Sequence, residues 1–412
     1  MKAITEVTNT PKKRTGFWIW LGGVITLLLI GSILITSALV RRAILGGERL
    51  SEDQREVVLA IAEFPSLAKS TIEQVTGPVF GFSPFLLKRK DIEKASWIRK
   101  FPAPTDKGFL LFSGIAPPSR ESIIQLIKIS DGKVIAEWKP DWAAINDKIT
   151  NKKYAPKGAK EFLSAVHPVL LNNGEIVFNT NNALVRIGLC DSKPVWVADK
   201  IFHHSNEIDL DGKSIWVPSV TNEYFSYNPW LKKNLRDDSL ARVSLDGDVL
   251  ENHSFSKILI DNGLREFLLG RAGIQFNEDP IHINQISVAP NDSLYWKRGD
   301  LLISARHLSS VFIYRPSTGK VLWHQQGPWM NQHSAHFVDD HRISIFDNNV
   351  FGGAPTTQPF VKPDSVNRVF VYDFVTKQAT EPYAEQLALA KPITMTAGRA
   401  QVLPDGGLFI EE

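Results

Sequence analysis

Four histidines and one arginine are the residues of this sequence best suited to chemistry. His167, His204, His282 and His333 each stand at the start of an expected strand, and Arg306 ends another. A neutral imidazole is a nucleophile that can carry a covalent intermediate, and it can also move protons. A guanidinium offers an anion a planar fork, and its charge does not depend on pH. These residue types indicate covalent and acid–base chemistry on an anionic group.

Two of the histidines are followed by an asparagine two positions later. The pairs are His204 with Asn206 and His282 with Asn284. In a strand, residues i and i+2 share a face, so each asparagine is expected to point to the same side as its histidine. We expect the histidines to bind an oxyanion and transfer protons, and the asparagines to bind substrate.

These residues recur because the sequence repeats. From about residue 107, five units and the start of a sixth combine a first strand, usually led by histidine, with Asp-Gly or Asn-Gly turns and further hairpins. Four short antiparallel strands per unit, arranged radially, make a β-propeller. We therefore predict an all-β fold, a six-bladed β-propeller over residues 101–412, with the leading histidines around its central channel.

An uncharged run from Gly16 to Val40 precedes the repeats. It is long enough to cross a membrane as a helix and too long for the core of a cleaved signal peptide. We predict a cytoplasmic tail at 1–15, an uncleaved single-pass transmembrane helix at 16–40 and a linker at 41–100. The linker is expected to contain an amphipathic helix over 51–63. The propeller is expected to be periplasmic or extracellular.

The composition excludes several classes of function. A net charge of +3 over 412 residues gives no nucleic-acid footprint. The single cysteine, Cys190, excludes an intramolecular disulfide and a cysteine-based metal cluster, and we expect it to be buried. We expect no bound cofactor.

The stretch from Gly299 to Asn349 resembles the arylsulfotransferase family. Arg306 ends a strand, TGKVLW follows at 318–323, then Gln332-His333, and finally ISIFDNN at 343–349. Several motifs in this order are more specific than any one of them. The resemblance extends more loosely from about residue 160 to the end.

The resemblance implies transfer of a sulfuryl group from an aryl sulfate ester to a phenol. It places the family's catalytic histidine at His333, its sulfate-binding arginine at Arg306, and a further histidine and asparagine at His282 and Asn284. We assign His204 to the same site, and we expect a sulfohistidine at His333. For a small polar sulfate ligand near the chain end, the candidates are Thr394, Thr396 and Arg399.

Two other interpretations of the chain stay open. The first is a non-catalytic, membrane-anchored propeller that binds or scaffolds other molecules. The second is a metal enzyme, since three histidines could hold zinc even with no Asp or Glu at ligand spacing. It is disfavoured because Arg306 would repel a cation and attract an anion. A homodimer is also left open.

Neighbouring residues are expected to be structural. His167 precedes a proline, His307 should point away from Arg306, and Asp347 with Asn348 should form a turn that could also hold His333. The insert at 221–240 could stack an aromatic substrate at the channel mouth, or its aromatic residues could pack on one another: Tyr224, Phe225, Tyr227 and Trp230.

Overall fold

The computed structural model describes residues 15–45, 54, 57–58, 108–116, 121–151, 164–180, 182–221, 224–270, 278–350 and 366–411. These residues belong to two compact units, 1–81 and 82–412. The expected tail at 1–15, the linker at 41–100 and its amphipathic helix lie almost entirely outside the described residues.

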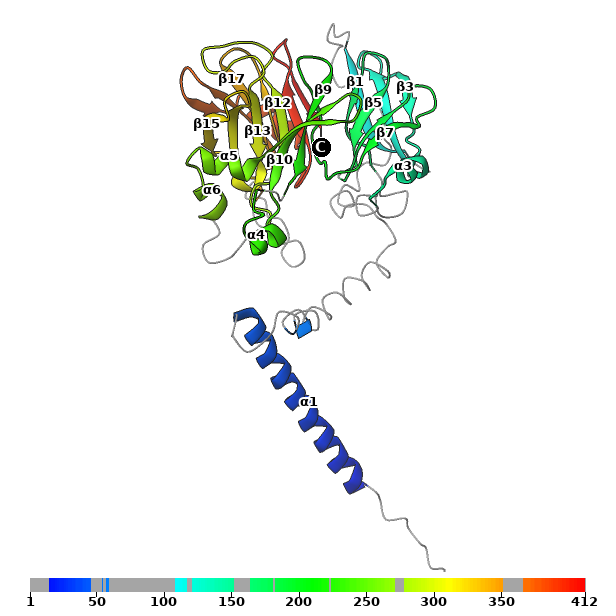
Figure 1. Ribbon diagram of the computed structural model, residues 1–412, viewed down its shortest axis with the longest axis vertical. Coiled ribbons are helices and arrows are strands. Elements are labelled where there is room, and N and C mark those ends of the chain that lie inside the picture. Colours follow the sequence, from blue (N-terminus) through cyan, green and yellow to red (C-terminus); the bar gives the residue numbers. More distant parts are fainter. Residues whose placement is uncertain are drawn as a thin grey trace, which may run out of the picture. The chain divides into compact units, whose positions relative to one another are not determined.

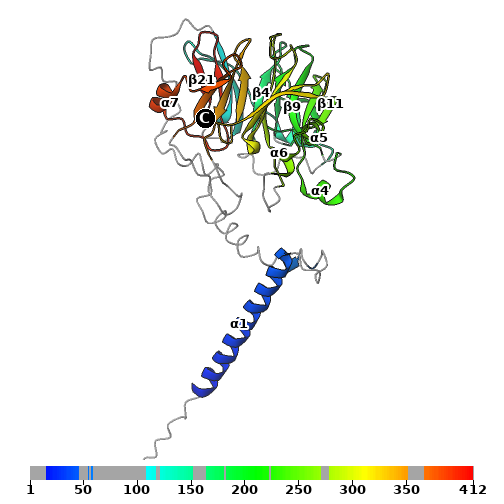
Figure 2. The ribbon, with the colours of Figure 1, turned by 90° about the vertical axis from the view of Figure 1, so that its left-hand side faces the viewer.

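The first unit contains one long apolar helix, α1 (Thr15–Leu45), drawn in blue in Figures 1 and 2. Residues 20–40 form a stretch of 21 residues with a mean hydropathy of 2.4. Its large apolar side chains, such as Leu28 and Leu34, are exposed. By length and composition this helix is a candidate membrane span or signal sequence, and it coincides with the transmembrane segment expected at 16–40.

The second unit consists of short antiparallel sheets that follow one another along the chain (Figure 1). The first sheet has three strands: β1 (Phe109–Ala116), β2 (Glu121–Lys128) and β3 (Val134–Trp138). The second has four: β4 (Val166–Leu170), β5 (Ile176–Asn179), β6 (Leu184–Ile187) and β7 (Pro194–Ala198). The third comprises β8 (Glu207–Ile208), β9 (Ser214–Val220), β10 (Asp238–Ser244) and β11 (Val249–Ser254).

Two more four-stranded sheets and a hairpin complete the unit. The fourth sheet comprises β12 (Ile283–Val288), β13 (Leu301–Ala305), β14 (Ser310–Arg315) and β15 (Lys320–Gln326). The fifth comprises β16 (Ser334–Phe337), β17 (Arg342–Asp347), β18 (Arg368–Asp373) and β19 (Gln378–Thr380). The hairpin is β20 (Arg399–Val402) with β21 (Leu408–Glu411).

Short helices connect the strands. They are α3 (Trp142–Lys148), α4 (Pro229–Asn234), α5 (Phe255–Asp261), α6 (Glu266–Leu269), the 3₁₀ turn η4 (Arg306–Leu308) and α7 (Ala384–Ala390). Asn228 caps α4 by accepting from the backbone N–H groups of Trp230 and Leu231, and Ser254 caps α5 in the same way through Lys257.

The arrangement is propeller-like with five blades, so the prediction of six blades was wrong. Five sheets have three or four strands, while the sixth repeat supplies only the hairpin β20–β21 among the described residues. The first strands of neighbouring sheets lie beside one another: β1 with β4, β8 with β12, β12 with β16, and β16 with β20. First strands are therefore innermost, as expected for a propeller.

The predicted Asp-Gly turns close hairpins in several blades. Gly212 and Gly247 have φ values of 64° and 95°, a region that glycine enters without steric cost. The Asp211 side chain accepts from the N–H of Lys213 at 2.7 Å and so reinforces its turn. Turn chemistry therefore sets the register of the strands that lead to the channel.

The apolar core lies between the sheets. One cluster joins the third and fourth sheets around Phe255, Phe312 and Ile286, and another joins the fourth and fifth around Trp296 and Ile343. Burial of this apolar surface is the main force that holds neighbouring blades together. The inner ends of the strands can therefore carry polar residues.

Cys190 does not belong to this core. It is exposed, in the turn between β6 and β7, so the expectation that it is buried was wrong. Residue type alone predicts that a cysteine is buried. Cys190 is exposed because it lies in a tight turn, where no sheet covers it.

Candidate active site

Three of the leading histidines have a left-handed backbone. The φ values are 45° at His167, 59° at His204 and 56° at His282. This region is uncommon for residues other than glycine and costs about 1–3 kcal/mol unless the surroundings hold it. The same conformation in three successive blades supports the expected repeat register. In the fifth blade the left-handed residue nearest before the first strand is Asn331, two positions before His333.

Three of these histidines and Arg306 converge at one end of the inner strands. The His204 ring centroid lies 5.0 Å from that of His282 and 5.7 Å from that of His333. Strand β13 runs antiparallel to β12, so Arg306 at its end lies beside His282, whose carbonyl accepts from the Arg306 backbone N–H at 2.9 Å. The predicted cluster is thus assembled from three blades.

His333 is the most enclosed histidine of this cluster. His333 is 5% exposed, and among the described residues its Nδ1 atom has no hydrogen-bond partner. Burial, followed by the charges of His167 and Arg306, lowers the pKa of His333 well below the ordinary value of 6.5. The imidazole is therefore neutral near pH 7, the form in which it is a nucleophile.

Gln332 fixes the segment before this nucleophile candidate. Its side-chain amide donates to the hydroxyl of Ser304 and to the carbonyls of Ala305 and Ser310. The His333 backbone N–H donates to Phe346 at 2.9 Å. The Gln-His motif thus docks the fifth blade onto the fourth.

Arg306 lies in the same enclosed environment, with 4% of the residue exposed. Burial lowers its pKa to about 10, against the opposing charge of Asp279, so the guanidinium stays cationic at neutral pH. One guanidinium nitrogen donates to the carbonyl of Met395 at 3.0 Å, which places the segment at 394–397 beside it. A buried cation in this position is suited to an anionic group.

Asp279 is a site residue that the sequence analysis missed. One of its carboxylate oxygens lies 2.6 Å from Nδ1 of His282. A carboxylate there holds a proton on Nδ1 and orients the ring, leaving Nε2 for the other partner. The acidic residue three positions before His282 was the available sequence signal.

His307 also belongs to the site, so the expectation that it points away was wrong. Its ring stacks on that of His282, with centroids 4.3 Å apart, and its Nε2 lies 3.4 Å from the Arg306 guanidinium. The reason is that residues 306–308 leave the strand and form the 3₁₀ turn η4. Strand alternation, on which the expectation depended, ends at Ala305.

The two asparagines differ in how they are used. Asn284 is fully buried, and both its side-chain amide atoms are without hydrogen-bond partners among the described residues. By contrast, Asn206 donates to the carbonyls of Val166 and His167, and it accepts from Asn179. The substrate-binding role expected for Asn206 conflicts with these bonds, which join the second and third blades.

The chain end supplies a second cation near the histidines. A guanidinium nitrogen of Arg399 lies 3.4 Å from Nδ1 of His167. Burial, followed by the charge of Arg399, lowers the pKa of that histidine to about 3. The charge of His167 also contributes to the lowered pKa of His333, so His167 lies close to the site. The hydroxyl of Thr394 instead donates to Ala397 and holds its own turn.

Asp347 and Asn348 hold the turns around this end of the fifth blade, as expected. The Asp347 carboxylate accepts from the N–H groups of Met330 and Asn349 and pairs with Arg368. The Asn348 amide donates to Ala397 at 2.8 Å. Both residues therefore brace the loops on either side of His333.

One group of ligand atoms near the site is close enough for a metal ion. The nitrogen and carboxylate atoms of Asp279, His282 and His307 lie within 4.8 Å of one another. This set contains the carboxylate that the sequence seemed to lack, and two histidines with one carboxylate can hold zinc. However, both Nδ1 atoms already contact Asp279, and the Arg306 guanidinium beside His307 favours an anion.

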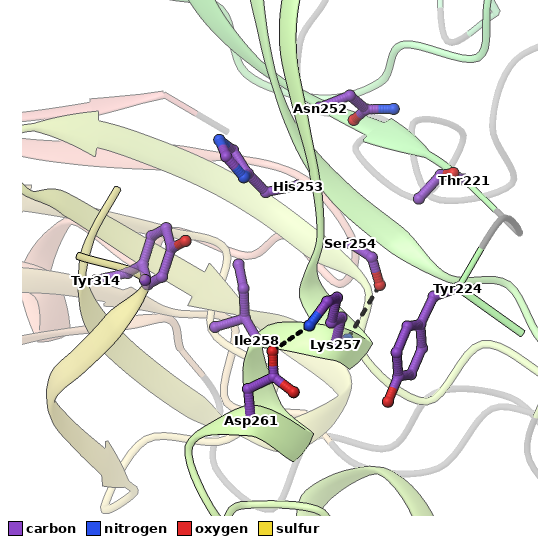
Figure 3. Close-up of a pocket in the computed structure, with 10 residues that line it drawn as sticks. Thr221, Tyr224, Asn252, His253, Ser254, Lys257, Ile258, Asp261 and Tyr314 are labelled. Carbon is purple, nitrogen blue, oxygen red and sulfur yellow. Dashed lines mark hydrogen bonds and ion pairs between the residues drawn. The ribbon is translucent and has the colours of Figure 1, made fainter. Parts of the chain in front are cut away.

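Three of the four aromatic residues of the insert pack on one another, the second of the two expectations, while Trp230 is exposed. Tyr224 lies 4.9 Å from Phe225 and 6.3 Å from Tyr227, measured between ring centroids, and Phe225 is buried in the core. Tyr224 lines a cavity of about 470 Å³ near the Lys257–Asp261 ion pair, where no expected catalytic residue lies (Figure 3). A different cavity of about 370 Å³ reaches Asp279.

The buried histidines make stability depend on pH. Burial, followed by Arg399, lowers the pKa of His336 to about 3, whereas an unfolded histidine titrates near 6.5. Below pH 6.5 this histidine binds a proton in the unfolded chain but not in the folded chain. It therefore lowers the free energy of unfolding as pH falls. Between pH 7.5 and 5.5, the free energy of unfolding of His336→Asn should therefore rise by about 1.4 kcal/mol relative to that of wild type.

Urea unfolding at both pH values measures this difference. Variant and wild type must be compared, because burial raises the pKa of Glu207 to about 7. That group raises the free energy of unfolding as pH falls, equally in both proteins. His341→Gln is the control, since Asp340 raises the pKa of that exposed histidine. An equal gain in both variants would contradict the assignment.

Comparison with known proteins decides the family. Residues 167–412 match the family model described as Arylsulfotransferase (ASST). The chain belongs to the arylsulfotransferase family. The match begins at the first leading histidine and includes His204, His282, Arg306 and His333.

No curated protein matches the sequence. Similar solved structures include a protein of unknown function from Bacteroides caccae, 15% identical, with a TM-score of 0.32 over 59% of this chain and 70% of that one. Kuenenia stuttgartiensis hydrazine synthase is 8% identical, with a TM-score of 0.37 and 69% coverage of each chain. These two structures are too distant to indicate the activity of this arylsulfotransferase-family member.

Proposed function

We propose that this protein transfers a sulfuryl group from an aryl sulfate ester to a phenol through a sulfohistidine at His333. The observation that carries the proposal is the position of the buried His333 imidazole, whose lowered pKa keeps it neutral. It stands in a cluster with two further histidine rings and a buried arginine. Family membership supports arylsulfotransferase activity in general.

The first step forms one bond and breaks another. The neutral His333 attacks sulfur, the S–N bond forms, and the S–O ester bond breaks with its electron pair on the aryl oxygen. Arg306 holds the sulfuryl oxygens, and the unpartnered amide of Asn284 can add a donor. His282 or His204 supplies the proton that the aryl oxygen takes.

The second step is the reverse with a different phenol. The acceptor loses its proton to the same histidine, its oxygen attacks the sulfur, and the S–N bond breaks to regenerate His333. Asp279, 2.6 Å from Nδ1 of His282, keeps that ring oriented through both steps. No metal or carrier is required, because the histidine itself stores the group.

A chromogenic aryl sulfate tests the proposal. The full-length protein in detergent should release aryl product in a burst without acceptor and turn over continuously when phenol is added. Chelator should change neither phase. Absence of both phases would contradict the proposal and favour a non-catalytic binding propeller, whereas loss of both on chelation would favour the metal interpretation.

We also propose that α1 is an uncleaved membrane anchor, with residues 1–15 in the cytoplasm and the propeller periplasmic or extracellular. The support is the apolar segment at 20–40, whose mean hydropathy is 2.4. Protein extracted from membranes should retain its original N-terminus, and external protease should reach the propeller in intact spheroplasts. An N-terminus beyond residue 40, or full protection of the propeller, would contradict this topology.

A further inference from the structure

Two further residues, His203 and Asp238, lie next to His204. Nδ1 of His203 faces Nδ1 of His204 at 2.7 Å, and Nε2 of His203 lies 3.5 Å from the carboxylate of Asp238. His203 is 2% exposed and Asp238 is fully buried. The three side chains thus form a line in which His203 and His204 share a hydrogen bond. His203 Nε2 contacts Asp238 only at ion-pair distance and has no hydrogen-bond partner among the described residues.

Backbone contacts hold this line in place. The His203 N–H donates to Pro218 on β9 at 3.0 Å, and the left-handed φ of 59° at His204 turns its ring out of the strand direction. Asp238 accepts from the N–H of Ile283 at 2.6 Å and from Arg236 at 3.0 Å. The carboxylate is therefore anchored to the residue next to His282, in the neighbouring blade.

The charge state of Asp238 follows from its partners. Burial alone would raise its pKa, but the charges of His203, Arg236 and His282, with a hydrogen bond from Arg236, hold it below its usual range. The buried carboxylate is thus an anion that can stabilise a positive charge on His203. By contrast, burial and the neighbouring histidines lower the pKa of His204 well below 6.5, so a charge on His204 alone is unfavourable.

The contact between two Nδ1 atoms requires one proton between them. When His203 carries protons on both nitrogens, its Nδ1–H points at the lone pair of His204 Nδ1, and His204 has its own proton on Nε2. When His204 gives up the Nε2 proton, it can take the Nδ1 proton from His203. His203 is then neutral and keeps its Nε2 proton towards Asp238.

We infer that Asp238, His203 and His204 form a proton relay that protonates the leaving aryl oxygen and deprotonates the acceptor phenol. The inference rests on the proposed function and decides between His204 and His282 as the proton donor. In the donor step, the proton moves from His204 Nε2 to the aryl oxygen as the S–O bond breaks, and the His203 proton refills His204. In the acceptor step, every movement is reversed. His203 and Asp238 are positioning residues that act through His204.

The test uses leaving groups of different basicity. His203→Gln keeps a polar side chain but cannot carry the mobile proton. Release of aryl product by the full-length protein in detergent, without acceptor, is measured for phenyl sulfate and for 4-nitrophenyl sulfate. We expect about 100-fold slower release of phenol and less than about threefold slower release of nitrophenol, because only the poor leaving group needs a proton.

Two further variants complete the experiment. Asp238→Asn should show the same selective loss, and His253→Gln, a histidine of the same sheet that contacts Glu251, should show none. Equal slowing of both substrates in His203→Gln, or no slowing of phenyl sulfate, would overturn the relay.

A spectroscopic measurement separates the relay from the proposed function. Full-length protein with ¹⁵N-labelled histidine should give a deshielded imidazole N–H signal from the shared proton, which disappears in His203→Gln. If wild type releases no aryl product but shows this signal, the proposed function fails and the relay geometry stands. Absence of the signal in wild type would overturn the relay whatever the activity.

Discussion

Replacing His333 with asparagine is expected to abolish sulfuryl transfer. The variant loses the only atom in our account that attacks sulfur, so release of aryl product should fall more than about 10⁴-fold. Binding of the aryl sulfate should survive, because Arg306 and Asn284 remain. Pre-steady-state release of a chromogenic aryl product measures the rate, and protection from thermal unfolding by the ester measures binding.

His336 provides a matched control for this experiment. It lies on the same segment, it is 9% exposed, and among the described residues its Nε2 atom has no hydrogen-bond partner. It differs from His333 in that it lies farther along β16 and its Nδ1 contacts the hydroxyl of Ser287. His336→Asn should keep the burst. If His336→Asn lost the burst and His333→Asn kept it, the nucleophile would have to be reassigned.

Arg306→Met is the second change with a large expected effect. The guanidinium is the cation that stands beside the cluster, and removing one electrostatic donor from an enclosed site costs about 10²- to 10³-fold in rate. Arg306→Lys should recover only part of the loss, because an ammonium keeps the charge but not the planar fork. The rate of aryl release at saturating ester measures both variants.

Arg315 is the control for a lost arginine in the same sheet. It pairs with Asp300 through two contacts of 2.8 and 2.7 Å, at the opposite end of β14. Arg315→Met should lower stability without the selective loss in rate. Equal rates for wild type and Arg306→Met would show that the sulfuryl group is held elsewhere, with Arg399 as the next candidate.

The local pattern of the chain predicted much of this site. The strand expected to end at Arg306 lies at 301–305, and the ISIFDNN segment at 343–349 lies mostly in the strand at 342–347. The repeat then placed His204, His282 and His333 at equivalent strand starts, so residues far apart in sequence could be expected to meet. These inferences succeed because side-chain direction in a strand has a fixed period.

Other features depend on contacts between blades, which no local pattern encodes. Asp238 reaches the backbone N–H of Ile283, in another sheet. His307 enters the site because the strand breaks into η4 immediately after Ala305. The count of six blades failed because a two-stranded hairpin and a full blade begin with the same sequence pattern.

The chemistry of the cluster also depends on its surroundings. The residue type histidine predicts a pKa near 6.5, whereas burial keeps His333 and His204 neutral over a wider range of pH. The carboxylate of Asp279, 2.6 Å from Nδ1 of His282, favours a proton on that nitrogen. These assignments need the distances between side chains.

Mass spectrometry of the covalent intermediate tests the central claim most directly. Full-length protein is mixed with an aryl sulfate in the absence of phenol, quenched at once and digested. We predict an added mass of one sulfuryl group on the peptide that contains His333, absent in His333→Asn and lost from wild type when phenol is added. An added mass on any other residue, or turnover of ester and phenol with no sulfuryl-protein at any time, would contradict the account.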